Sequence, residues 1–342
     1  MKTYQNHRGK TTPTILHSRL TGLLAALVAT AVVQARAADG PEARAGSTPA
    51  AASSPDTAET KTEKPPPLPL HQIEGNGGIF STLSAYIVNP PRNGEAVGRP
   101  SVGFAFVDIG NGRNLEAFTL TETPWKRLEL GYGFNRLDLG DLPQDIERAT
   151  GARLRDDSVL LHNFNARLQL LKEGECDRKW VPAVTFGTHF KYNDTIKRID
   201  GDLGGAMTAI GVGDNSGVDF TLYASKLFAS LPRPVLLELG GRATKGAHIG
   251  LLGFTGDYEF VFEGNVVVFV TSQLALAAEY RQKPNEYKPI GGLVKGEDDW
   301  WTIDAAYVVN NHLTLAAGYG HFGGVLNHDA NGVWGITTKF EF

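Results

Sequence analysis

The chain has 342 residues, of which 42% are hydrophobic and 20% charged, a composition that can support a folded core. Its formal net charge is -4, and no cluster of lysine and arginine stands out, so we expect no nucleic-acid partner. Cys176 is the single cysteine, which excludes an intramolecular disulfide.

The first 37 residues have the features of a secretory signal peptide. Basic residues precede an apolar run over 20–33, and Ala35-Arg36-Ala37 follows as a small-residue cleavage motif. The alternative is a membrane-spanning helix, but the run is shorter than the roughly 20 apolar residues that a span requires. We predict cleavage after Ala37 and export from the cytoplasm.

Residues 38–70 are rich in alanine, proline, serine, threonine and glutamate and end in a proline-rich stretch. Such a segment cannot bury enough apolar surface to offset its ordering entropy, so we predict a disordered linker. The folded part is predicted over 71–342. Within it, residues 71–98 precede the regular strands and are expected to form a strap, a plug or a supernumerary strand.

Alternation with a period of two dominates the remainder. In 127–135, Leu128, Leu130, Tyr132 and Phe134 share one face, while charged and small residues share the other, as in a strand with one apolar side. The same pattern predicts about twelve strands, over 101–109, 114–121, 127–135, 162–170, 184–192, 218–228, 235–243, 258–270, 274–280, 301–309, 313–321 and 334–342.

Two architectures fit this alternation: a periplasmic β-sandwich, and a transmembrane barrel whose apolar face meets lipid. Short and long connections alternate along the chain, and aromatic residues crowd the apolar faces and the strand ends. Both features are typical of outer-membrane barrels. We therefore predict an all-β protein, a transmembrane antiparallel up-and-down β-barrel of about 12 strands in the bacterial outer membrane, in contact with outer-membrane lipid.

The last predicted strand ends in Phe340 and Phe342 on one alternating face. This ending resembles the C-terminal signature that bacterial barrels present to their assembly machinery. We expect both residues to act as an assembly signal, with the barrel-assembly machinery as a partner.

The predicted inner face carries charges of both signs. Two interpretations remain open: a narrow channel that guides a small polar solute, or ion-paired side chains that fill the lumen. The predicted lumen-lining residues are Arg127, Glu129, Arg167, His189, Lys191, Asp219, Glu238, Arg242, Glu259, Glu263, Glu279, Arg281, Asp304 and Lys339.

Catalysis finds little support in the sequence. His162 falls on an apolar face with no serine at a suitable local spacing, which argues against an acyl hydrolase. The acidic run 297–299 is more typical of a solvated loop than of a divalent-cation site. We predict a protein that is not an enzyme and has no cofactor and no metal.

Four strings carry a family resemblance: HFKYN at 189–193, GLLGF at 250–254, EYRQKP at 279–284 and EDDWW at 297–301. With them, the chain from residue 71 onward resembles an uncharacterised proteobacterial family of envelope β-barrels, catalogued as a domain of unknown function. The resemblance implies an envelope location and a barrel, and it transfers no activity and no functional residues.

Two functions follow as expectations. The first is a narrow channel or facilitator for small polar solutes. The alternative is a non-transporting envelope barrel with a structural or polysaccharide-export role.

Overall fold

A computed structural model describes residues 69–283, 285, 287–291 and 293–342. The predicted signal peptide and nearly all of the predicted linker lie outside these residues. Pro69 and Leu70, which the sequence placed in the linker, are buried.

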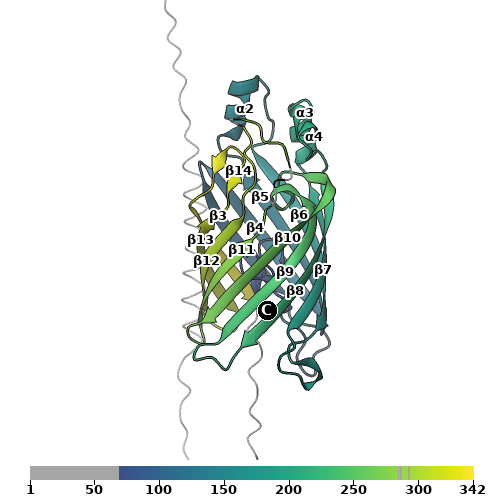
Figure 1. Ribbon diagram of the computed structural model, residues 1–342, viewed down its shortest axis with the longest axis vertical. Helices are drawn as coiled ribbons and strands as arrows, with labels where there is room; N and C mark the ends of the chain where they lie inside the picture. Colours follow the sequence, from purple (N-terminus) through teal and green to yellow (C-terminus); the bar gives the residue numbers. More distant parts are fainter. Residues whose placement is uncertain (1–68, 284, 286, 292) are drawn as a thin grey trace, which may run out of the picture. The chain divides into compact units, whose positions relative to one another are not determined.

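Twelve antiparallel strands close into one barrel, as predicted (Figure 1). They follow one another around the barrel in chain order, and the last pairs with the first. The strands are β3 (Ser101–Gly110), β4 (Arg113–Trp125), β5 (Leu128–Asp138), β6 (Ser158–Leu171), β7 (Ala183–Asn193), β8 (Ser216–Phe228), β9 (Val235–Gly246), β10 (Phe254–Phe269), β11 (Leu274–Arg281), β12 (Trp300–Val308), β13 (Leu313–His321) and β16 (Val333–Glu341).

Closure depends on β16, which lies between β13 and β3. In this seam, Lys339 is in register with Thr314 of β13 on one side and with Gly103 of β3 on the other. Because every barrel strand pairs on both sides, no edge is left with unpaired backbone groups, which a hydrocarbon environment would penalise.

The two faces of the wall differ as the alternation predicts. Outward side chains are large and apolar and remain exposed, for example Phe260 at 70% and Ile303 at 60%. Inward side chains include fully buried arginines and carboxylates. This is the inverted arrangement of a transmembrane barrel, whose outer wall meets lipid. No helix in the part of the chain that the structure describes is both long and apolar enough to cross a membrane.

The two ends of the barrel are built differently. At one end, which we call the short-turn end, the connections are brief except for the one between β6 and β7, which includes a 3-10 turn, η1 (Glu175–Asp177). The opposite, long-loop end appears at the top of Figure 1. It carries α2 (Leu142–Thr150), α3 (Ile196–Asp202), α4 (Ala206–Ala209), the 3-10 turn η2 (Ala247–Gly250) and the hairpin β14 (Gly324–Val325) and β15 (His328–Asp329).

The sequence around α2 explains where this helix begins and ends. Pro143 occupies its first turn, where a missing amide hydrogen costs nothing. Gly151 ends it in the left-handed conformation with φ of 76°, and its amide donates to the carbonyl of Glu147.

Candidate functional site: the filled lumen

Residues 69–88, which we call the plug, enter the barrel at the short-turn end and return to that end. At the entry, the carbonyl of Pro69 accepts a hydrogen bond from Lys339 at 2.8 Å. At the exit, the amide of Val88 donates to Glu129 near the start of β5, and its carbonyl accepts from Thr123 near the end of β4. Between these points β1 (Leu70–Gln72) pairs with β2 (Asn76–Gly78). The plug is therefore a re-entrant hairpin with both ends at one mouth.

Glu74 lies at the tip of this hairpin and is fully buried. Its carboxylate accepts from cations on three different strands: Lys191 of β7, Arg242 of β9 and Arg281 of β11. The Arg242 Nη2 to Oε2 distance is 2.9 Å, and the Arg281 Nη1 to Oε2 distance is 3.3 Å.

Two wall carboxylates complete the network. Asp219 lies 2.7 Å from Lys191 Nζ and 2.9 Å from Arg242 Nη1, and Glu263 pairs with Arg242 Nε at 2.9 Å and Arg281 Nε at 3.2 Å. The wall alone contributes three cations and two anions, so the plug carboxylate balances the charge. An unbalanced buried charge costs several kcal/mol. We call these six residues the Glu74 cluster: Glu74, Lys191, Asp219, Arg242, Glu263 and Arg281.

Backbone groups of the plug bind further wall residues. Glu279 accepts from the amides of Ser81 at 3.1 Å and Thr82 at 2.7 Å. Arg167 donates to the carbonyl of Gly77 at 2.8 Å while pairing with Glu129 at 2.9 Å. Backbone groups of the plug thus form hydrogen bonds with charged wall residues that water would otherwise have to hydrate.

Two wall glycines make room for the plug. A Cβ atom on Gly131 would overlap the carbonyl oxygen of Gly75, and one on Gly133 would overlap that of Glu74. Glycine in a strand interior is unfavourable unless another backbone approaches closely, and here the plug backbone does so.

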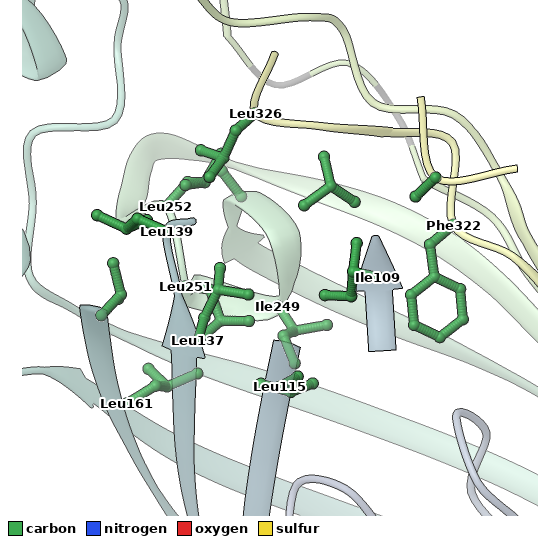
Figure 2. Packing of buried hydrophobic residues seen from close by; sticks show 14 of the residues in the cluster. Ile109, Leu115, Leu137, Leu139, Leu161, Ile249, Leu251, Leu252, Phe322 and Leu326 are labelled. Atoms are coloured by element: carbon green, nitrogen blue, oxygen red, sulfur yellow. The ribbon is translucent and has the colours of Figure 1, made fainter. Parts of the chain in front are cut away.

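The long-loop end is closed by an apolar cap. Figure 2 shows Ile249 and Leu251 lying among Leu115, Leu137 and Leu161 of the wall, all members of one buried cluster. Polar wall groups hold this loop inward, since Lys191 donates to the carbonyl of Ile249 at 3.0 Å and Asn193 to that of Gly250 at 2.9 Å. The cap thus occupies the lumen at the long-loop end, and the plug enters it from the short-turn end.

Twelve of the fourteen predicted lumen residues are buried on the inner wall. The structure brings Lys191, Asp219, Arg242, Glu263 and Arg281 into the Glu74 cluster and joins Glu129 with Arg167. His189 is hydrogen-bonded to Asn165 at 2.8 Å and Thr221 at 2.9 Å. The remaining buried members are Glu238, Glu279, Asp304 and Lys339.

Two predicted lumen residues lie elsewhere. Arg127 precedes β5 at the short-turn end, where it is half-buried and pairs with Glu175. Glu259 is exposed, because β10 begins to pair with β11 only at Glu263 and its earlier residues extend beyond that neighbour. Period-two alternation predicts which face of a strand a residue occupies, but it does not predict how far along the barrel axis the residue lies.

Inward residues of the four strings that carry the family resemblance meet near the long-loop end. Asn193 of the first string binds Gly250 of the second. Arg281 of the third lies 5.8 Å from the ring of Trp300, in the fourth, and Glu297 of that string accepts from the amide of His248.

Little in the sequence supports a catalytic role for His162, whereas Phe340 and Phe342 are predicted to form an assembly signal. His162 is hydrogen-bonded to Tyr132 at 2.8 Å, and its cross-strand partners are Phe134 and Tyr192, so its surroundings are aromatic. Phe342 is exposed and contacts the Phe340 ring edge-on at 5.3 Å. Their role as an assembly signal stays a prediction.

Sequence reasoning assigned no role to Glu74. A signal was present, because Glu74 is the only Asp, Glu, Lys or Arg between Pro69 and Val88 and it precedes a glycine. A lone carboxylate in a neutral segment that enters a charged lumen is a candidate counter-ion.

A family model described as "Protein of unknown function (DUF3034)" matches residues 70–337. A search of curated proteins finds no match to the sequence.

Several solved structures of outer-membrane barrels are similar in fold. The NanC porin is 12% identical, with a TM-score of 0.43 over 71% of this chain and 100% of that chain. An outer membrane channel from Pseudomonas putida F1 is 10% identical, with a TM-score of 0.39 over 72% and 96%. The outer membrane phospholipase of Salmonella typhi is 9% identical, with a TM-score of 0.34 over 73% and 93%. At these values the likenesses carry no argument about function.

Proposed function

We propose that this chain, which belongs to the DUF3034 family, is a gated outer-membrane conduit for small polar solutes, held closed by its own plug. One observation carries the proposal. The plug is a re-entrant hairpin whose two ends lie at the same mouth, fastened at its tip by the ion pairs of Glu74. Such a segment leaves the lumen without threading through the barrel.

The wall supports a lumen that opens when the plug leaves. Gly131 and Gly133 present no side chains where the plug backbone now lies, so its departure leaves a hollow rather than a packed core. The groups then exposed, among them Glu279, Arg167 and the wall members of the Glu74 cluster, are charged and hydrate readily. A passage lined by both signs suits a polar solute better than an apolar one.

A cross-link that ties the plug to the wall tests this function. The amide nitrogen of Ala85 lies 2.8 Å from Ser225 Oγ of β8, so these two neighbouring positions are chosen for a pair of cysteines. Cys176 is exposed and is first replaced by serine. We expect the oxidised A85C/S225C/C176S protein to carry no current in a planar bilayer, and the reduced protein to show the openings of C176S.

The single variants A85C/C176S and S225C/C176S serve as controls, because neither closes a disulfide. Equal current from oxidised and reduced double-cysteine protein, with the cross-link verified by mass, would show that the plug does not gate. If neither C176S nor a variant whose plug is loosened by Glu74→Gln carries current, the proposal of a conduit is refuted.

The second candidate is a non-transporting envelope barrel with a structural or export-associated role. The apolar cap favours it, because Ile249 and Leu251 of the cap share one buried apolar cluster with Ile73 and Phe80 of the plug, so apolar packing fills the long-loop end of the lumen. It predicts no current even after the plug is loosened, so the same recordings separate the two functions. Both candidates are non-enzymatic and place the apolar outer wall in outer-membrane lipid.

A further inference from the structure

A cavity of about 510 Å³ lies at the short-turn end, between the plug and the inner wall formed by β9 to β13 and β16. Small inward side chains create it, because Ala275 of β11 lies directly opposite Ala306 of β12, and Ala306 lies directly opposite Ala316 of β13. Turn residues 271–273 and 310–312 form its mouth. This volume falls within the range of sites that hold a small ligand or a short stretch of chain.

Aromatic side chains from three parts of the chain line this cavity. Phe80 and Tyr86 belong to the plug, Phe269 ends β10, and Phe342 is the C-terminal residue. Aromatic rings on a concave apolar surface are what proline-rich segments dock against, because the flat rings pack on the pyrrolidine rings. The cavity therefore has the lining of a polyproline-binding groove.

The same surface offers hydrogen-bond donors at its edge. The side chains of Arg92 and Asn311 line the cavity, and both residues are exposed to solvent. A proline carries no amide hydrogen, so a polyproline segment presents carbonyl acceptors that need donors from its binding surface. Guanidinium and amide side chains supply such donors.

The chain itself carries a matching segment next to the cavity. Residues 65–68 are Pro-Pro-Pro-Leu and lie outside the described residues, immediately before Pro69. Pro69 is buried and lines the cavity. Leu68 is the only large aliphatic or aromatic residue in 38–69. The apolar part of the predicted linker is thus the part that adjoins the cavity.

The attachment at Pro69 brings this segment within reach. Lys339 donates to the Pro69 carbonyl at 2.8 Å, which fixes where residues 65–68 begin. In the polyproline II conformation, four residues advance about 12 Å, enough to extend from Pro69 into the cavity. Docking is intramolecular and the proline run is already stiff, so little entropy is lost on binding.

We propose that residues 65–68 dock in this cavity as a polyproline II segment, with their rings against its aromatic lining. The segment then covers the plug at the short-turn end, and the disordered part of the linker is limited to residues 38–64. The proposal goes beyond the conduit and stands without it, since its test measures no transport.

Distance measurement between two spin labels tests the proposal on the full mature chain in lipid nanodiscs. Cys176 is first replaced by serine, and cysteines for labelling are placed by Lys64→Cys, just before the proline run, and Ser230→Cys, at an exposed position in a short turn. We expect pulsed electron double resonance to give a single narrow distance peak. The pair Ser47→Cys and Ser230→Cys, with its first label in the middle of the linker, should give a broad distribution.

Two further substitutions in the 64/230 labelled protein should each abolish the narrow peak. Leu68→Asp places a carboxylate on the docking segment, which an apolar cavity does not accept, and it lies outside the barrel. Ala306→Leu fills the cavity from the wall. Ala58→Asp makes the same charge change elsewhere in the linker, and Ala305→Leu adds the same bulk to the exposed outer face of β12, so both controls should keep the peak.

A broad distribution in the protein with only the 64/230 labels would overturn the proposal and leave the cavity to another occupant. A narrow peak that persists in Leu68→Asp or in Ala306→Leu would also overturn it, because the order of the segment would then arise outside the cavity. Far-ultraviolet circular dichroism confirms that each variant is folded before labelling.

Discussion

Arg242 forms a bidentate pair of hydrogen bonds with Glu74, which lies 168 residues away in the sequence. Nη1 donates to Oε1 at 3.1 Å and Nη2 donates to Oε2 at 2.9 Å, with both side chains fully buried. This parallel geometry is the strongest form of an arginine–carboxylate pair. It makes the tip of the plug its most specific point of attachment to the wall.

Replacing Glu74 with glutamine should release the plug. The substitution leaves the three cations of the Glu74 cluster facing two wall anions, and an uncompensated buried charge costs about 3–5 kcal/mol. We expect faster amide hydrogen exchange across residues 70–88, with the barrel strands little affected.

Two variants make this result specific. Glu95→Gln removes a carboxylate from the exposed pair with Arg99, and solvent-exposed pairs of this kind contribute little to stability. Glu74→Gln combined with Arg281→Gln restores neutrality and should recover part of the protection. Unchanged exchange of the plug in Glu74→Gln would refute its role as an electrostatic anchor.

Gly131→Ala should displace the plug by steric overlap. The new methyl group would collide with the carbonyl of Gly75, and overpacking of this kind costs about 1–3 kcal/mol. We expect chymotrypsin to cleave the variant after Phe80 or Tyr86, which are buried in the wild-type protein.

Gly256→Ala is the matched control for that experiment, because Gly256 also lies in a barrel strand and a Cβ atom there meets nothing within 4 Å. It should resist chymotrypsin as the wild type does. Resistance of Gly131→Ala as well would mean that the plug and β5 are less closely packed than the structure shows.

The cap should loosen on acidification through His248. Burial lowers the pKa of His248, Glu297 raises it in part, and Lys283 lowers it again, so the folded-state pKa lies below the ordinary value. The cap is therefore fully stable above an unfolded-state pKa of about 6.5 and loses stability as the pH falls below that value. Hydrogen-exchange protection factors of residues 247–253 should decrease over this window. His248→Gln should remove the dependence, and an identical decrease in that variant would assign it to another group.

Leu251→Ala should open the cap without releasing the plug. Truncating a buried leucine in a packed cluster costs about 2–5 kcal/mol, and Leu251 packs among Leu137, Leu161 and their neighbours. Hydrogen exchange should quicken in 247–253 while residues 70–88 stay protected. Leu231→Ala, at an exposed position in a short turn, is the control. Equal loosening of plug and cap would show that the two closures form one cooperative unit.

The sequence alone determined the barrel. Period-two alternation assigns each strand residue to a face, and the same split across twelve segments leaves few folds that satisfy it. The predicted positions of Lys191, Arg242 and Arg281 on the inner wall follow from this local rule. Arg127 and Glu259 do not line the lumen, because each lies near the end of a strand. Arg127 pairs with Glu175 in a connection, and Glu259 precedes the part of β10 that pairs with β11.

Only the tertiary structure decided what fills the lumen. Glu74 lies 117, 168 and 207 residues from the three cations that bind it, and the glycine-rich segment around it carries no periodic signal for where it docks. The cavity of about 510 Å³ at the short-turn end likewise forms only where Ala275 and Ala306 of neighbouring strands come together. Periodicity is a property of neighbours along the chain, whereas charge balance and empty volume are properties of groups that meet only after the barrel has closed.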